Sequence, residues 1–323
     1  MKKIFPFLIS AFLTALILFI VRIKVARPML LADRFVYGSG LLEVVILALY
    51  AGFITWKILN PSESSKWRIR IWTFFSVVFF SQFLLGIFVS DIFLMSGKLH
   101  VPVPMVIMAG PVFRGEGFFM PILLLSTIIL VGPAWCSHLC YIGSWDAIAS
   151  NSKKRPVGTV GNRFIIRFVI IIVLISAALI LRFSGTAPVY AAYFAIAFGI
   201  IGVLIMIVLS RSKGLMVNCL AWCPIGVFTT ILGRISPFRI SFNDTCSSCG
   251  VCTLSCRYDS LRPSDISRKK PDLTCTLCGD CISSCRGKSL QYSFGPFSGD
   301  RVRTFFIVLT VVTHSVFLGL ARI

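Results

Sequence analysis

The chain has 323 residues and a formal net charge of +20, and 57% of its residues are apolar while only 14% are charged. Because ordinary soluble domains are roughly a quarter charged, this composition excludes a compact water-soluble globule and predicts a bilayer protein with a modest soluble portion. The Lys and Arg residues gather in short clusters between apolar stretches, as in the cytoplasmic loops of membrane proteins, so a nucleic-acid partner is not expected.

Seven apolar stretches approach the length of about 20 residues that a membrane-spanning helix requires. They lie near 4–21, 41–57, 71–95, 117–135, 164–182, 189–209 and 304–321. The last stretch is short and contains His314, so it is predicted as either a transmembrane or an interfacial helix. The pattern predicts an all-α integral membrane protein with six or seven transmembrane helices.

Basic segments between the apolar stretches indicate which helix ends face the cytoplasm. Residues 57–70, 153–167 and 211–213 contain clustered Lys and Arg, so we expect these segments on the inner side. With seven spans, the same topology puts the cysteine-rich end of the chain in the cytoplasm. The basic residues between 22 and 34 disagree with it, which leaves the orientation of the first hairpin open.

The sequence contains an internal repeat. Residues 136–143 and 219–226 both read C-x3-C-x-I-G, and each follows a pair of predicted spans. A duplicated helical hairpin explains the repeat, and paired repeats in membrane proteins often build a site where they meet. Residues four apart lie on one face of a helix, so each motif can present two sulfur atoms in one direction. The candidate metal ligands are Cys136, Cys140, Cys219 and Cys223.

Three interpretations of these four cysteines stay open. They can bind an iron–sulfur cluster or another metal such as copper, form a redox-active dithiol, or pack as small side chains where helices meet. Duplication of the motif favours a functional role. His138, inside the first motif, is either a further ligand or an interfacial side chain, and we favour the second interpretation.

Residues 236–303 differ from the rest because they are polar and hold eight cysteines. The cysteines form two runs with the spacing C-x2-C-x2-C-x3-C, which is typical of bacterial two-cluster ferredoxins, where the fourth cysteine of each run ligates the other cluster. We therefore predict a small α+β ferredoxin-like domain with two [4Fe–4S] clusters. The predicted ligands are Cys246, Cys249, Cys252 and Cys285 for one cluster, and Cys275, Cys278, Cys281 and Cys256 for the other. Structural zinc is disfavoured, since zinc sites use separated C-x2-C pairs.

Two arginines depart from the usual ferredoxin pattern. Arg257 and Arg286 follow the fourth cysteine of each run, where ferredoxins commonly have proline. A guanidinium beside a cluster stabilises added negative charge, so we expect higher reduction potentials than in low-potential ferredoxins. The alternative is that both arginines face anionic headgroups or a partner protein.

These features divide the chain into four predicted parts. Residues 1–60 form an N-terminal transmembrane hairpin, and residues 61–235 form the duplicated transmembrane hairpins that end in C-x3-C motifs. Residues 236–303 form a cytoplasmic ferredoxin-like domain, and residues 304–323 form the last helix.

The combination of spans, C-x3-C motifs and a two-cluster segment resembles the NapH/NosR-type membrane polyferredoxins, a family of ferredoxin-type quinol dehydrogenase subunits. Residues 219–224 match the C-x3-C-P motif of that family, whereas Tyr141 replaces the proline after Cys140. The resemblance covers roughly residues 70–298. It implies that electrons from quinol pass through clusters to partner redox proteins.

Quinol oxidation requires a proton acceptor near the ring hydroxyls, and ionisable groups at membrane depth are costly and therefore suggest function. The quinol-site candidates are Glu43, Asp91, His100 and Glu116.

The predicted protein is a multi-pass subunit of a bacterial or archaeal cytoplasmic (inner) membrane, with its ferredoxin domain facing the cytoplasm. It passes electrons between the quinone pool and a partner oxidoreductase, as in anaerobic respiration. The alternative function is that of the CcoG-type polyferredoxins, in which the C-x3-C pairs bind copper during assembly of a respiratory enzyme. A third interpretation is a scaffold whose clusters only anchor a soluble partner.

Overall fold

The structure is a computed structural model that describes residues 4–25, 29–93 and 102–320. The chain is mostly helical and divides into two compact units. The first unit comprises Met1–His100 and Tyr292–Ile323, and the second comprises Val101–Gln291. All twelve cysteines lie within the second unit, so the sulfur chemistry of the chain is confined to it.

Seven helices in the described part of the chain are long and apolar enough to cross a membrane. They are α1 (Ile4–Lys24), α3 (Gly40–Ile58), α4 (Pro61–Phe88), α6 with its extension (Phe119–Leu139), α8 (Arg163–Phe183), α9 with its extension (Pro188–Lys213) and α15 (Asp300–Leu320). This count confirms the predicted number of membrane-length helices and is compatible with a multi-pass membrane protein.

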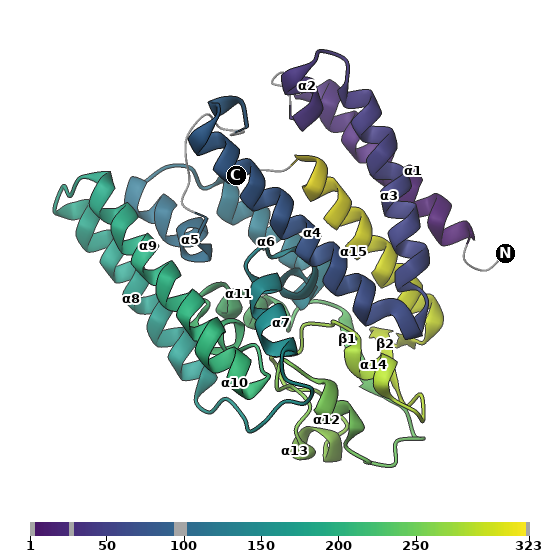
Figure 1. The fold of residues 1–323 in the computed structure, drawn as a ribbon. Coiled ribbons are helices and arrows are strands. Elements are labelled where there is room, and N and C mark those ends of the chain that lie inside the picture. Colours follow the sequence, from purple (N-terminus) through teal and green to yellow (C-terminus); the bar gives the residue numbers. More distant parts are fainter. Residues whose placement is uncertain (1–3, 26–28, 94–101, 321–323) are drawn as a thin grey trace. The chain divides into compact units, whose positions relative to one another are not determined.

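The last apolar stretch forms a full-length helix in the first unit. Figure 1 shows α15 beside α1 and α3, and the three helices pack on one another. Arg303 near its start donates to the carbonyls of Ile58 and Leu59 at the end of α3, both at 3.0 Å. His314 is fully buried and lies 3.1 Å from the hydroxyl of Tyr50, so the histidine that weakened the prediction is satisfied inside the unit.

Helix α4 begins earlier than its apolar stretch. The prediction that residues 57–70 form a loop is wrong beyond residue 60, because Pro61 occupies the first turn of a helix whose first turns contain the basic residues. The Lys57 ammonium and the Arg70 guanidinium lie over the Trp67 ring, 5.6 and 4.9 Å from its centroid. Because the Trp67 ring stabilises these positive charges, the helix can begin among basic residues and continue into the apolar stretch.

A short helix that we did not predict lies in the second unit. Helix α5 (Pro104–Arg114) shares an apolar cluster with α8 and α9, to which Met105, Leu174 and Phe198 contribute. Its 11 residues are too few to cross a bilayer, and Pro111 lies inside it, so the sequence pattern gave no clear helical signal.

The remaining elements are short. In the first unit these are α2 (Leu31–Phe35), the 3₁₀ helix Asp91–Phe93 and β3 (Phe297–Ser298). In the second unit they are the 3₁₀ turn Gly132–Ala134, α7 (Gly143–Asn151), α10 (Arg211–Lys213), α11 (Ile225–Leu232), β1 (Phe238–Phe242), α12 (Val251–Ser255), α13 (Pro263–Ser267) and α14 (Asp280–Ser284). Strand β2 (Leu290–Phe294) starts in the second unit and ends in the first, where it pairs antiparallel with β3. In that pairing Ser293 is opposite Ser298. The helices α12 and α14 carry cysteines of the two ferredoxin-type runs.

Candidate iron–sulfur centres

The two C-x3-C motifs fold in the same way. Each forms a five-residue π-helix, Trp135–Leu139 in the first and Asn218–Trp222 in the second. The N–H of Cys140 donates to the carbonyl of Trp135 at 3.1 Å, and the N–H of Cys223 donates to that of Asn218 at 2.9 Å. The second cysteine of each motif then has an extended backbone, so the expectation of a plain α-helical face is wrong. Such single π-turns are rare and are frequent at functional sites.

The I-G pair of each repeat supplies backbone donors to the second cysteine. Burial raises the pKa of the Cys140 thiol, whereas the N–H groups of Gly143 and Ile142 lower it. Burial likewise raises the pKa of Cys223, which the N–H groups of Ile225 and Gly226 lower. Backbone donors stabilise negative charge on sulfur, so in both repeats the I-G pair partly offsets the effect of burial on the second cysteine.

The fold brings the four C-x3-C cysteines together. Burial raises the pKa of Cys219 well above its usual range, and the neighbouring Asp146, Cys223, Cys140 and Cys136 raise it further. Because charge on each of the other three cysteines affects the pKa of Cys219, the four thiols must lie close together. The Cys136 thiol also reaches the Thr229 hydroxyl, 3.6 Å away on α11, so the two repeats meet at these sulfurs.

A buried arginine faces this group. Arg167 on α8 donates to the carbonyls of Cys219 and Gly226, the second at 3.4 Å. Its charge also lowers the pKa of Cys223. Gly226 makes room for it, because a Cβ there would lie 2.7 Å from the guanidinium carbon. Sequence reasoning placed Arg167 only among inner-side basic residues, and nothing in the local pattern marked it as a neighbour of the cysteines.

Asp146 was also missed. It is fully buried on α7 and accepts the N–H of Cys219 at 2.8 Å, so it connects the helix after the first motif to the second motif. Burial raises its pKa to about 6, although Ser210 and the N–H groups of Cys219 and Asn218 oppose the shift.

Residues 113–157 match a family model described as a 4Fe-4S binding domain. This span contains Cys136 and Cys140 but none of the eight ferredoxin-type cysteines. The match supports an iron–sulfur protein of ferredoxin type and suggests iron–sulfur electron transfer. No curated protein sequence and no solved structure matches the chain.

The second ferredoxin-type run gathers the thiols that we predicted as one ligand set. Burial raises the pKa of Cys281 well above its usual range, and Cys278, Cys275 and Cys256 raise it further. Cys256 comes from the first run, so the structure places it with the three cysteines of the second. The N–H of Ser260 donates to the Cys256 sulfur at 3.3 Å. The assignment of these thiols as ligands of one cluster stays a prediction.

The cysteines of the first ferredoxin-type run include one that is exposed to solvent, unlike those of the second run. Burial raises the pKa of Cys252 to about 11, and Cys246 and Cys249 act on the same thiol. Cys249 itself is exposed, and the N–H of Val251 is the main cause that lowers its pKa. The Ser255 hydroxyl donates to that of Ser284 at 2.8 Å, so α12 and α14 lie side by side just before the fourth cysteine of each run.

Corresponding loops of the two runs share an unusual backbone. Ser248 and Leu277, each just before the second cysteine of its run, have positive φ angles of 55° and 56°. The glycines that follow those cysteines, Gly250 and Gly279, also have positive φ. A left-handed conformation is uncommon for a bulky residue such as leucine, and strain of this kind clusters at functional sites.

The arginines that replace proline behave differently from each other. Arg257 donates to the carbonyls of Gly214 and Lys153, both at 2.8 Å, and so anchors the first run to the rest of the unit. Arg286 is exposed and lowers the pKa of Cys249, so it remains the better candidate to influence a cluster.

A cavity of about 20 Å³ joins the two sets of buried thiols. Cys136 and Cys219 of the C-x3-C group and Cys275 of the second run all line it, together with Arg167 and Tyr258. Thiols of both sets therefore face the same small cavity.

These donors are thiols, the ligand type that an iron–sulfur cluster requires. Among the residues that the structure describes, no group of three Cys, His, Asp or Glu side chains is arranged to hold one metal ion. Tetrahedral zinc, with bonds of about 2.3 Å, needs its sulfurs within about 4 Å of one another. Thiolate sulfurs are also the ligands of an iron–sulfur cluster, so the chemistry of these donors agrees with the 4Fe-4S family match of residues 113–157.

Ser137, next to His138, connects the first motif to the ferredoxin segment. The Ser137 hydroxyl donates to the carbonyl of Thr276 at 2.9 Å, and the same oxygen lies 2.9 Å from Nδ1 of His138. The direction of the bond between Ser137 and His138 depends on which ring nitrogen of the histidine carries the proton. Both interpretations of His138, as a ligand and as an interfacial side chain, stay predictions.

Three of the four quinol-site candidates lie among the described residues, and the predicted role of each stays a prediction. Glu43 accepts the N–H of Ala32 at 2.8 Å, and Asp91 lies in the short 3₁₀ helix beyond α4; both belong to the first unit. Glu116 is exposed after α5 in the second unit, and His100 lies outside the described residues.

Proposed function

We propose that this chain is a membrane-bound electron-transfer protein with three iron–sulfur centres in one structural unit. The observation that carries the proposal is the cavity shared by Cys136, Cys219 and Cys275. Iron–sulfur clusters accept and release electrons one at a time, and rates of transfer depend on how closely successive centres are placed. A continuous series of thiol groups in one unit suits that task.

The proposed ligand sets follow the grouping of the thiols. Cys136, Cys140, Cys219 and Cys223 hold the centre at the ends of the membrane helices. The two ferredoxin-type centres take Cys275, Cys278, Cys281 and Cys256, and Cys246, Cys249, Cys252 and Cys285. In this arrangement Arg167 offsets negative charge at the first centre, and the Ser137 hydroxyl bonds the ferredoxin segment at the Thr276 carbonyl. The Tyr258 hydroxyl adds a weaker contact with the Cys136 carbonyl.

The burial of the thiols supports an order along the series. The C-x3-C centre is at the membrane helices, the second-run centre adjoins it across the cavity, and the first-run centre ends at exposed Cys249. We propose that the membrane end exchanges electrons with the quinone pool and that the Cys249 end meets a soluble or membrane-bound redox partner. The inner membrane of a bacterium or archaeon, with this end in the cytoplasm, suits both steps.

Metal and sulfide analysis of anaerobically purified protein tests the proposal. Three cubane clusters predict about twelve iron atoms per chain. The double variant Cys136→Ser/Cys219→Ser should retain about eight, because it removes one ligand set and leaves the other two. Cys278→Ser serves as the comparison, since it removes a different centre. Wild-type protein with eight or fewer irons would contradict a C-x3-C cluster, and iron-free protein would contradict the function.

A further inference from the structure

A group of cations gathers where two loops of the second unit meet, one before α8 and one at the end of α9. The group consists of Lys153, Lys154, Arg155, Arg211 and Lys213. The Lys153 ammonium donates to the Ser212 carbonyl at 2.7 Å, and the Lys213 ammonium donates to the Thr159 carbonyl at 3.4 Å. Each ammonium has three N–H donors, so both keep donors for a further acceptor.

Backbone contacts fix the two loops to each other. The N–H of Val157 donates to the Lys213 carbonyl at 2.7 Å. Arg257 joins the loops as well, because it donates to the carbonyls of Gly214 and Lys153. Gly214 has a positive φ of 65°, and a Cβ there would lie 2.9 Å from a guanidinium nitrogen of Arg257. The loops therefore form one defined surface that carries the cations.

This surface carries charge of one sign. Residues 147–162 and 205–243 contain no Asp or Glu. The ion pairs of Asp259, Asp265 and Asp272 join other arginines, at positions 163, 262 and 268. Lys154, Arg155 and Arg211 are exposed. Because like charges repel, adjacent cations of this kind favour an anion among them.

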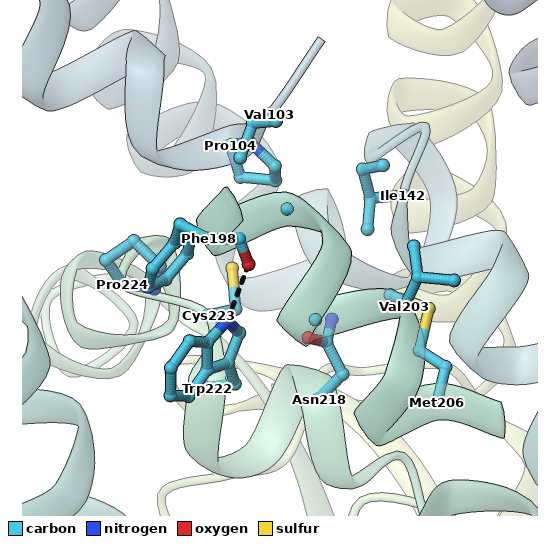
Figure 2. A pocket seen from close by; sticks show the side chains of 12 residues that line it. Val103, Pro104, Ile142, Phe198, Val203, Met206, Asn218, Trp222, Cys223 and Pro224 are labelled. Atoms are coloured by element: carbon cyan, nitrogen blue, oxygen red, sulfur yellow. Dashed lines mark hydrogen bonds between the residues drawn. The ribbon is translucent and has the colours of Figure 1, made fainter. Parts of the chain in front are cut away.

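The end of α9 places an apolar surface directly before these cations. Here the helix forms the π-turn Met206–Ser210. Met206 faces inward, where it lines an apolar pocket with Asn218 (Figure 2). The next three side chains are exposed, and they are Ile207, Val208 and Leu209. An apolar surface of the membrane-length helix thus ends at Arg211, the first residue of the basic loop.

Helix α7 extends the apolar surface. It packs against the π-turn and against α10. Its Trp145 and Ile148 side chains are 43% and 52% exposed, and its chain continues into Lys153. Tryptophan is enriched where a membrane meets water, because its ring is apolar and its N–H is polar. Apolar and cationic groups therefore adjoin on both loops.

We propose that this surface binds the headgroup phosphate of an anionic phospholipid such as phosphatidylglycerol, with the acyl chains along the exposed end of α9. Basic surfaces at the ends of membrane helices recognise such headgroups, and an arginine fork can bond two oxygens of one phosphate. Free phosphate would use only the cations, whereas a phospholipid also uses Ile207, Val208 and Leu209. The site requires no cluster, so it goes beyond the electron-transfer function.

Native mass spectrometry of the detergent-solubilised full chain, titrated with phosphatidylglycerol or phosphatidylcholine, tests this site. The wild type should bind phosphatidylglycerol at least about tenfold more tightly, because each Lys or Arg beside an anionic lipid contributes roughly a fivefold factor. The triple variant Lys154→Gln/Arg155→Gln/Arg211→Gln should lose this preference. Equal affinity of the wild type for the two lipids would overturn the site, whether or not the variant folds.

A matched control removes three positive charges elsewhere. Lys269→Gln/Lys270→Gln/Lys288→Gln changes exposed lysines of the ferredoxin segment, so both triple variants have the same net charge. The control should keep the affinity for phosphatidylglycerol within about twofold, because salt screens exposed charges outside the site. An equal loss in both variants would show that binding follows net charge alone, and the proposed site would be rejected.

Fragments of the lipid separate a phospholipid site from a phosphate site. Inorganic phosphate and glycerophosphoglycerol, which lack acyl chains, should not displace phosphatidylglycerol at equal concentration. Displacement by either one would make this surface a phosphate site and would contradict the proposal. Iron content shows whether the clusters of each variant are intact. A wild type with all its clusters and no lipid preference would reject this site while leaving the electron-transfer function standing.

Discussion

At the scale of single residues, Arg167 has the largest expected influence on the chemistry. It is buried against the C-x3-C group, whereas Arg286 lies in solvent beside Cys249. A centre becomes more negative when it is reduced, so a nearby positive charge raises its potential, and burial limits screening of that charge. The two arginines should therefore act on different centres and with different strength.

Arg167→Gln should lower the midpoint potential of the C-x3-C centre. A unit charge a few ångströms from a buried site, at an effective dielectric constant of about 20, corresponds to a shift on the order of 100 mV. Arg167→Lys should retain most of the potential, since it keeps the charge. Arg286→Gln is the matched control and should shift only the first-run centre, by less. Potentiometric titration followed by paramagnetic resonance measures all three, and an unchanged midpoint in Arg167→Gln would remove Arg167 from this role.

Asp33 illustrates a different residue-scale effect, on stability in the first unit. Its carboxylate accepts a hydrogen bond from Nε of Arg22 at 2.6 Å. It also accepts one at 2.8 Å from the N–H of Gly40, the first residue of α3. The hydrogen bond from Arg22 is the main cause that lowers the pKa of Asp33 below its usual 3.8. This pairing also satisfies one of the basic residues that disagreed with the predicted topology.

Asp33→Asn should lower the thermal unfolding midpoint at pH 7 by about 2–4 °C. Because the folded-state pKa is depressed, the stabilisation is complete above pH 3.8 and is lost as the pH falls through the folded-state value. The difference between variant and wild type should therefore shrink below pH 3.8. A difference of the same size at pH 7 and at pH 3 would show that the ionised carboxylate is not the cause.

At the scale of elements, the first turn of α8 holds two parts of the second unit together. Arg167 contacts the second C-x3-C motif, and Arg163, one turn earlier, donates to Asp259 at 2.5 Å and to Asp272. Arg163 and Asp259 are both almost fully buried. One helical turn thus positions the repeat and the ferredoxin segment relative to each other.

Arg163→Met should destabilise the second unit by about 3 kcal/mol, because removal of one partner leaves the buried Asp259 carboxylate short of a partner. Arg262 also pairs with Asp259 but is partly exposed, so Arg262→Met should cost less than about 1 kcal/mol. Hydrogen exchange of residues 256–272 compares the two. Equal protection in both variants would mean that α8 does not hold this segment.

The sequence predicts elements well where a short pattern dictates them. The seven apolar helices and the two repeated cysteine motifs follow from composition and spacing within about 20 residues. Helix α5, the π-turns and the contact of Asp146 with Cys219 do not, because they depend on packing between residues far apart in the chain. The cavities beside the C-x3-C motifs could not be predicted either, because residues from several distant segments line them together with the cysteines of the motifs.

At the scale of the whole molecule, the cysteines share one compact unit with the membrane-length helices α6, α8 and α9. The helices α1, α3, α4 and α15 belong to the other unit. Among the described residues, the first unit has four helices of membrane-spanning length and the second has three, and all twelve cysteines of the chain lie in the second. The C-x3-C motifs and all eight ferredoxin-type cysteines lie in the second compact unit, while the predicted border at residue 235 stays a prediction. The electron path that we propose therefore runs inside one unit, and its centres should keep fixed distances.

Fixed distances predict a magnetic interaction between neighbouring centres. When both are reduced and paramagnetic, the C-x3-C centre and the second-run centre should broaden or split each other's resonance, because Cys136, Cys219 and Cys275 line one cavity of about 20 Å³. Cys136→Ser/Cys219→Ser should abolish the interaction and leave a simpler spectrum from the ferredoxin-type centres. Tyr258→Phe, which removes only a hydroxyl 3.5 Å from the Cys136 carbonyl, should leave it intact. Independent spectra in the fully reduced wild type would mean that the two thiol groups do not form consecutive steps of one path.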